Sequence, residues 1–503
     1  MLNGGHATMT ELPHSRRMLI LVICCAAVLM SGMDNTIVNI ALPVIHKDLH
    51  ASLSELQWVV DAYTLVLASL LMLSGSLGDR LGRRVIFLIG LIVFTTGSAL
   101  CGLAPGLGWL IAFRCVQALG GSMLNPVAMA IITNVFTDSR ERAFAIGVWG
   151  GIVGISIGLG PVIGGVLLQF AGWRSIFWVN VPIGIAAIVL LMLFVPESRA
   201  SVPRRPDPVG QVLVILGLAA LTSAIIEAPN RGWISAATAV AFGITAVAFG
   251  ALGAWESHRN QPLIELRFFR SIPFSGATLM AVCAFGNYSG FLFLNTLYLQ
   301  QVRGYSPLTA GLLTIPLAVG SLIFSPLSGR IVGARGPRIP LVSAGLVMTL
   351  GALMMIPADP GTPIPYIIVC YLLFSIGFGL VNTPITNTAV SGMPRSQAGI
   401  ASGIATTSRQ VGTTLGVAAV GSALSTELGH QAIRVGFRSA EVIPWWIVAC
   451  CGIFIVVGGF TTSTWWAKRS ATRVLSEEAA GKNPAPSVER LADTPEVTAK
   501  LIQ

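Results

Sequence analysis

Fourteen apolar runs divide this chain of 503 residues, and each is long enough to cross a lipid bilayer. One crossing takes about 20 residues as a helix. Because every backbone N–H and C=O group inside a bilayer must be bonded within the protein, such runs predict helices. Only 10% of the residues are charged, against about 25% in soluble domains. The runs are 18–43, 54–76, 85–104, 108–132, 143–169, 175–195, 209–228, 236–255, 273–300, 307–332, 340–357, 363–390, 397–424 and 442–466.

The charges between the runs predict how the chain crosses the membrane. If the N-terminus is cytoplasmic, arginines concentrate in the loops on that side, as in 80–84 and 330–338. Lys and Arg are retained on the cytoplasmic face of membranes. We therefore expect a multi-pass protein of the cell membrane with both termini in the cytoplasm. The first run lacks a small-residue cleavage pattern, so we expect a retained helix and not a signal peptide.

An internal repeat predicts the domain organisation. Gly75 and Gly82 lie seven residues apart in an arginine-containing stretch at the end of the second run. Gly329 and Gly336 have the same spacing in a similar stretch at the end of the tenth run. Six helices, two inserted helices and six more account for this spacing. The tail is polar and contains three prolines, which predicts disorder. The expected units are a cytoplasmic N-terminal segment (1–17), an N-terminal six-helix bundle (18–196), a linker with two inserted helices (197–271), a C-terminal six-helix bundle (272–466) and a disordered cytoplasmic tail (467–503).

Several classes of function find no support in the sequence. The eight cysteines lie inside apolar runs without the spacing of disulfide frameworks or metal sites. No Gly-x-x-x-x-Gly-Lys-Ser/Thr loop for a nucleotide is present, and no basic patch suits a nucleic acid. No nucleophile, base and oxyanion hole occur together. We expect no cofactor, no metal, no nucleic-acid partner and no enzymatic activity.

Two charged residues inside the apolar runs are candidates for the functional centre. Asp34 is the lone ionisable residue of the first run, and Arg114 lies six residues into the fourth. A charge at mid-bilayer costs roughly 2.5 to 3.5 kcal/mol on insertion scales, so each needs a partner. Arg114 cannot lose its proton, which makes Asp34 its natural acceptor. The pair is either a static structural contact or a proton site that opens when Asp34 is protonated.

The stretches around these residues resemble the fourteen-helix drug/proton antiporter family of the major facilitator superfamily. The resemblance covers almost all of residues 18–466 and implies an all-α membrane fold of two six-helix bundles. It also implies proton-coupled efflux of small amphipathic, cationic compounds by alternating access, by a monomer. A dedicated exporter of a lipid or a self-made metabolite, such as an antibiotic, is the first alternative, and a transporter-fold receptor or scaffold is the second. The resembling stretches are 34–43, 75–84, 114–121, 154–165 and 173–184.

The resemblance also suggests where substrates bind. Asp61 lies in a Trp-x-x-Asp-x-Tyr stretch similar to that of quaternary-ammonium exporters, which predicts a cation or proton site. The alternative is a solvated carboxylate near the outer mouth. Arg409 is either a substrate or gate contact or an anchor to backbone carbonyls. Tyr63 and Gln117, from the same motifs, complete the expected substrate contacts.

Two motifs are expected to act in gating. The first is a cytoplasmic loop in which Asp79 would bond a neighbouring helix end or arginine in one conformation and release it in the other. The second is a glycine face on the fifth helix, which lets another backbone approach closely and can act as a hinge. The loop residues are Gly75, Asp79, Arg80, Gly82 and Arg83, and the helix residues are Gly154, Gly158, Gly160, Pro161, Gly164 and Gly165.

Overall fold

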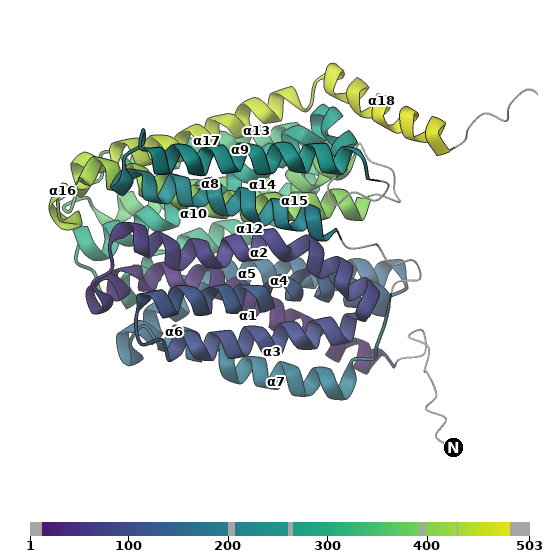
Figure 1. Ribbon diagram of the computed structural model, residues 1–503, viewed down its shortest axis with the longest axis horizontal. Coiled ribbons are helices and arrows are strands. Elements are labelled where there is room, and N and C mark those ends of the chain that lie inside the picture. Colours follow the sequence, from purple (N-terminus) through teal and green to yellow (C-terminus); the bar gives the residue numbers. More distant parts are fainter. Residues whose placement is uncertain (1–12, 200–206, 260–264, 392–397, 430, 483–503) are drawn as a thin grey trace, which may run out of the picture.

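The computed structural model describes residues 13–199, 207–259, 265–391, 398–429 and 431–482, and within them the chain is helical and contains no strand. The long helices run side by side along the longest axis (Figure 1). The start of α1 and all of α18 lie at one end of the bundle, here called the termini end, and α16 lies at the far end (Figure 1). The helices are α1 (His14–Leu49), α2 (Leu53–Leu81), α3 (Arg83–Gly102), α4 (Leu107–Val135), α5 (Ser139–Ala171), α6 (Ser175–Trp178), α7 (Asn180–Phe194), α8 (Pro208–Arg231), α9 (Ala236–Ser257), η2 (Leu266–Arg270), α10 (Ile272–Leu297), η3 (Tyr298–Val302), α11 (Pro307–Leu313), α12 (Ile315–Arg335), α13 (Arg338–Met355), α14 (Ile364–Ser391), α15 (Ala398–Leu428), α16 (Ile433–Ala440), α17 (Val442–Thr461) and α18 (Trp465–Lys482).

The predicted all-helical membrane fold is confirmed. In the described part of the chain, twelve helices are long and apolar enough to cross a membrane. α5 makes a thirteenth if its two segments, bent by 42°, form one span. α15 occupies the remaining predicted run with 31 residues, and its Thr and Ser residues make it less apolar than the others. The predicted fourteen crossings therefore agree with thirteen spans plus α15.

Local caps fix where helices begin. The Ser52 hydroxyl accepts a hydrogen bond from the Glu55 backbone N–H, and the Glu55 carboxylate accepts one from the Ser52 N–H at 2.7 Å, which starts α2. Asp207 accepts from the Gly210 N–H at 3.0 Å and starts α8. Such caps typically stabilise a helix by about 1 kcal/mol. α2 starts at the far end, where α1 ends, and α8 starts at the termini end, so the two run antiparallel (Figure 1).

Hydrophobic packing differs between the two ends of the bundle. Toward the far end, one continuous cluster joins α1 and α2 of the N-terminal half to α10, α14 and α17 of the C-terminal half. Toward the termini end, α1 to α5 and α7 share one cluster, whereas α10, α14 and α15 share another, against which Met72 of α2 packs. The halves are therefore closed against each other chiefly at the far end.

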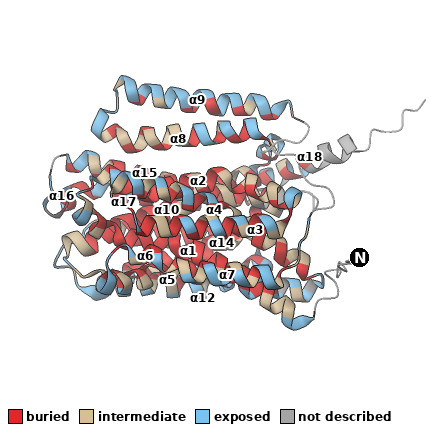
Figure 2. Cartoon of the chain, turned by 60° about the horizontal axis from the view of Figure 1, so that its bottom comes forward, coloured by how far each residue is buried: buried red, intermediate tan, exposed pale blue. Residues whose placement is uncertain are grey.

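The helices of the predicted insert, α8 and α9, lie on one flank of the bundle. α8 packs on α2 and α15, and α9 packs mainly on α8. Figure 2 shows α9 with most of its surface exposed, while α8 is buried on the side that faces the bundle. α8 lies at the edge of the contact between α2 and α15, so the pair does not separate the N-terminal half from the C-terminal half.

The expected disorder of the tail is wrong for its first part. α18 continues the chain as a helix from Trp465 to Lys482, and residues 483–503 lie outside the described part. Ala467, Ala471 and Val474 are buried on one face, and the helix packs on α10 and η2. The alanine-rich composition favours a helix, and three small apolar side chains at this spacing supply a packing face that the overall polarity of the tail concealed.

Candidate functional site

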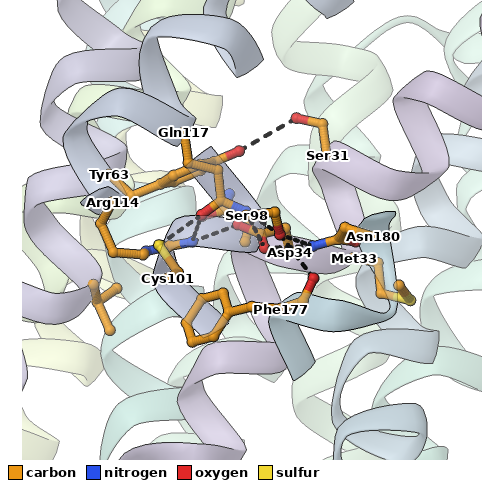
Figure 3. Close-up of polar contacts among 12 residues, drawn as sticks. Ser31, Met33, Asp34, Tyr63, Ser98, Cys101, Arg114, Gln117, Phe177 and Asn180 are labelled. Atoms are coloured by element: carbon orange, nitrogen blue, oxygen red, sulfur yellow. Dashed lines mark hydrogen bonds and ion pairs between the residues drawn. The ribbon is translucent and has the colours of Figure 1, made fainter. Parts of the chain in front are cut away.

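Asp34 and Arg114 form a buried ion pair in the N-terminal half (Figure 3). The Arg114 Nη1 lies 2.5 Å from the Asp34 Oδ2, and both side chains are almost fully buried, at 1% and 0% exposure. The other carboxylate oxygen of Asp34 accepts hydrogen bonds from the Gln117 amide at 2.8 Å and the Asn180 amide at 2.9 Å. Three donors on one carboxylate compensate the cost of burying its charge.

Arg114 is held by more than its acid partner. Its Nε donates to the Val59 carbonyl oxygen on α2 at 3.3 Å, and its Nη1 also donates to the Gln117 side chain at 2.7 Å. The guanidinium carbon lies 4.1 Å from the centre of the Tyr63 ring, a cation–π contact. Tyr63 and Gln117, expected as substrate contacts, thus belong to the ion-pair cluster.

The sequence did not identify Ser98 and Asn180 as members of this cluster. The Ser98 hydroxyl accepts from the Gln117 and Asn180 amides, both at 3.1 Å, and donates to a backbone carbonyl at 2.9 Å. Gly97 allows the arrangement, because a Cβ there would lie 2.6 Å from the Gln117 backbone. The available signal was an asparagine inside an apolar run, a residue type that tends to bond across membrane helices.

Asp61 is buried apart from this cluster. It is 0% exposed, and neither carboxylate oxygen has a hydrogen-bond partner within the described residues. The hydroxyl of Thr64, one turn away, donates to the Asp61 backbone carbonyl and accepts from Thr414 on α15. On the adjacent face of α2, the Trp58 indole donates to Glu227 of α8 at 2.9 Å. Asp61 is therefore enclosed where α2 meets α8 and α15, and not solvated at the mouth.

Arg409 of α15 has no ion-pair partner in the part of the chain that the structure describes. Its Nη2 donates to the Thr386 hydroxyl on α14, and its guanidinium carbon lies 5.8 Å from the centre of the Phe285 ring. Its Nε is buried without a partner. One of the two expectations for Arg409 was an anchor to backbone carbonyls, but the hydrogen bond found is to a side-chain hydroxyl. The Nε–H group of the guanidinium makes no hydrogen bond within the described residues.

A small cavity lies between the two halves, enclosed by α1 and α2 on one side and α10 and α15 on the other. Its volume is about 40 Å³, room for one or two waters, whereas drug-sized sites occupy about 300 to 1,000 Å³. A substrate would therefore have to widen it. In the described residues no three His, Cys, Asp or Glu side chains come together as metal ligands. The lining residues are Asn35, Thr36, Asn39, Val60, Phe285, Tyr288, Ser289, Leu292, Thr413 and Val417.

The glycines of α5 lie on two opposite faces and not on the single face that the sequence predicted: Gly158 and Gly165 face the C-terminal half, and Gly160 and Gly164 face α1. Toward the far end, a Cβ on Gly158 would meet Ala318 of α12 at 2.3 Å, and one on Gly165 would meet Pro307 of α11 at 2.6 Å. Gly160 and Gly164 approach α1 just as closely. Toward the termini end, a Cβ on Gly154 would meet nothing within 4 Å. Gly158 and Gly165 thus bring α5 close to the C-terminal half at the far end, whereas Gly154 makes no such approach toward the termini end.

The loop between α2 and α3 ties three helices together. Asp79 accepts two hydrogen bonds from Arg83, at 2.8 and 3.1 Å, and Arg83 also donates to the Ala130 carbonyl oxygen on α4 at 3.3 Å. Gly82 has φ of 122°, a backbone conformation that other residues rarely adopt. Arg80 is exposed. In the second copy of the motif Gly333 stands in the place of Asp79, so that copy lacks this carboxylate.

Comparison with known proteins gives consistent matches. Residues 24–417 match the Major Facilitator Superfamily. The multidrug resistance protein Stp of Mycobacterium tuberculosis (strain CDC 1551 / Oshkosh) is 38% identical over 82% of this chain and 76% of its own length. The tetracenomycin C resistance and export protein of Streptomyces glaucescens is 36% identical over 84% and 80%. A solved bacterial homolog of the human lysosomal transporter Spinster matches in fold, with a TM-score of 0.65 and 18% identity over 92% of this chain and 99% of that one.

Proposed function

We propose that this chain, which belongs to the Major Facilitator Superfamily, is a proton-coupled efflux transporter of the cell membrane that exports amphipathic compounds by alternating access. The observation that carries the proposal is the buried Asp34–Arg114 pair, because such charges are retained in membranes where they do work. The names of the relatives, a multidrug resistance protein and an antibiotic resistance and export protein, support export as the direction.

Asp34 is the proposed proton carrier. Protonation would remove the charge that holds Arg114 and would turn one carboxylate oxygen into a donor, so the contacts to Gln117 and Asn180 would have to rearrange. These contacts join α1 to α4 and α7. A proton bound or released at Asp34 would therefore change how α1 sits in the N-terminal half. Because α1 also contacts α5, α10 and α11, that change can reach the other half.

The gate follows from the difference between the two ends of α5. We take the termini end as cytoplasmic, in line with the arginine-rich loops there. On this basis we propose that the structure corresponds to a state closed on the outside and less tightly packed on the cytoplasmic side. Outward opening would separate Gly158 and Gly165 from α11 and α12, and the Asp79–Arg83 contact would hold α2, α3 and α4 together as a unit during that movement.

The substrate class has two candidates, which are a range of amphipathic cations and a single self-made compound such as an antibiotic. Asp61 is a buried acid, as a site for amphipathic cations requires, but it lies against α8 and does not line the central cavity. A dedicated exporter of a self-made antibiotic is the alternative, and the tetracenomycin C exporter among the relatives favours it. The two differ in whether one compound or many are moved.

The test is transport by purified full-length protein in proteoliposomes under an imposed pH gradient, across a panel of amphipathic compounds. The parent protein is expected to concentrate at least one of them and to release protons when it binds. Asp34→Asn should abolish both. Asp48→Asn is the matched control, since Asp48 is an exposed acid on the same helix. Accumulation that persists in Asp34→Asn would show that Asp34 is not the proton carrier.

A further inference from the structure

The central cavity has an aromatic wall supplied by the C-terminal half. Phe285 and Tyr288 of α10 line it, and the Tyr288 ring stacks on Phe378 of α14 at 4.1 Å between centres and 19° between planes. Phe285 also contacts Phe378 edge-on at 5.4 Å. The phenylalanine behind them holds both rings in place, so this wall is a preformed surface on which a flat ring can stack.

The opposite wall, from α1, is made of amides. Asn35 and Asn39 line the cavity one helical turn apart. The carbonyl oxygen of each side chain is buried without a hydrogen-bond partner in the described residues. An unpaired buried acceptor costs about 1 to 3 kcal/mol, and a ligand that brings O–H or N–H donors to this wall would recover that cost.

The charge near the cavity is positive. Arg409 lies one turn from the cavity-lining Thr413 and places its guanidinium against the Phe285 ring, with its Nε unpaired. No acid lines the cavity. Asp34 is neutralised by Arg114, and Asp61 is enclosed on another face of α2 next to α8. A cation in the cavity would therefore meet a like charge and no counter-charge.

We infer that the central cavity binds flat aromatic acids that carry hydroxyl groups, with the ring on Phe285 and Tyr288, the hydroxyl donors on Asn35 and Asn39, and the carboxylate or phenolate on Arg409. The inference rests on the proposed efflux function and names its substrate class. The hydroxyl groups and the acid group of such a molecule meet polar atoms that lack a hydrogen-bond partner, the amide oxygens on α1 and the Nε of Arg409. Its ring meets the cavity side of the aromatic wall. The cavity has to widen to admit such a ligand, which enters from the termini end, where the halves share less hydrophobic packing.

Equilibrium dialysis of purified full-length protein against three probes of similar size tests the inference. The probes are 6-hydroxy-2-naphthoic acid, whose hydroxyl and carboxylate lie at opposite ends of the ring system, its neutral methyl ester and the N-methylquinolinium cation. The acid is expected to bind at least tenfold more tightly than the other two, because a hydrogen bond to a charged group is worth about ten- to hundredfold in affinity. A cation that binds as tightly as the acid would overturn the inference.

Variants assign the contacts. Arg409→Gln should weaken the acid about tenfold and leave the ester within about twofold, whereas Arg409→Lys should keep the order of the probes. Arg438→Gln, which changes an exposed arginine at the far end, is the control. An acid-to-ester ratio unchanged in Arg409→Gln contradicts the assignment. If Arg409→Gln does not fold, Arg409→Lys and the three probes on the parent protein still decide.

The amide wall has its own test. 6-Methoxy-2-naphthoic acid lacks the hydroxyl donor, so Asn39→Ala should weaken the hydroxy acid severalfold and leave the methoxy acid unchanged. Equal losses for both would remove the hydroxyl from the substrate definition. Transport separates this inference from the proposed function. If the pH gradient drives the cation and not the acid, efflux stands and the substrate class fails, and if it drives no compound of the wider panel, the proposed function fails as well.

Discussion

Asp34 and Asp61 are both fully buried aspartates inside long helices, yet their surroundings are opposite. Asp34 accepts hydrogen bonds from an arginine and two amides, whereas Asp61 has no partner for either oxygen within the described residues. The difference shows that burial alone does not define a site. Asp34 is built to be charged in this state and to change partners, while Asp61 has no charged or amide donor and only the Thr64 hydroxyl beside it.

The largest expected effect comes from removing the positive partner of Asp34. Arg114→Ala should lower the free energy of unfolding by about 3 to 5 kcal/mol, because it leaves a buried carboxylate without its counter-charge. Thermal melting in detergent measures this. The double variant with Asp34→Asn should recover much of the loss, and Arg114→Lys should rescue poorly, since lysine lacks the planar fork that reaches Asp34, Gln117 and Val59 at once. A double variant no more stable than Arg114→Ala would show that the pair is not coupled.

Removing one neutral donor should have a smaller effect of the same sign. Asn180→Ala deletes the hydrogen bonds to Asp34 and Ser98 and should lower the free energy of unfolding by about 1 to 3 kcal/mol. It should also slow proton-driven transport, because the rearrangement at Asp34 begins from a weakened cluster. Asn230→Ala is the control, since that amide bonds Ser54 far from the cluster. A loss of stability in Asn180→Ala no larger than in Asn230→Ala would remove Asn180 from the functional site.

Asp61→Asn should have the opposite sign to Asp34→Asn. Replacing this carboxylate by a neutral amide is expected to leave the free energy of unfolding unchanged or to raise it by up to about 1 kcal/mol, so the melting temperature should not fall. Asp34→Asn loses an ion pair and should lower the melting temperature. Melting the two variants side by side makes the comparison direct. A clear loss of stability in Asp61→Asn would mean that Asp61 has a strong partner and that the contrast between the two acids is false.

The sequence predicted the helices and the Asp34–Arg114 contact, because charges are so scarce in the apolar runs that few pairings exist. It did not predict Ser98 and Asn180 as partners, since small polar residues recur throughout these helices and gain meaning only from the neighbour they face. The aromatic wall was also missed. Phe285 and Phe378 lie in helices rich in apolar residues, where an aromatic residue that lines a cavity has the same pattern as one that faces lipid. α18 was misjudged because the polarity of the tail outweighed three small apolar residues at helical spacing.

A third buried carboxylate, Glu441, lies between the two extremes and outside the membrane-spanning segments. It sits between α16 and α17 at the far end and accepts one hydrogen bond, from the Trp445 indole at 3.0 Å. Burial raises the pKa of Glu441 to about 8, and the Trp445 bond and the positive charge of Arg438 offset part of that rise. Its environment is thus poorer in donors than that of Asp34 and richer than that of Asp61.

The pH dependence of stability should report this intermediate position. Folded Glu441 keeps its proton up to about pH 8, whereas the unfolded chain loses it near the ordinary value of 4.5. The folded state therefore binds more protons between these values, and stability falls as the pH rises through that window. Melting curves from pH 5 to pH 9 should show a decline that is shallower in Glu441→Gln, which stays neutral, and unchanged in Glu427→Gln, an exposed acid of α15. Parallel curves for the parent and Glu441→Gln would mean that one indole donor is enough to keep a buried carboxylate charged. The contrast between Asp34 and Asp61 would then need a cause other than the number of hydrogen-bond donors.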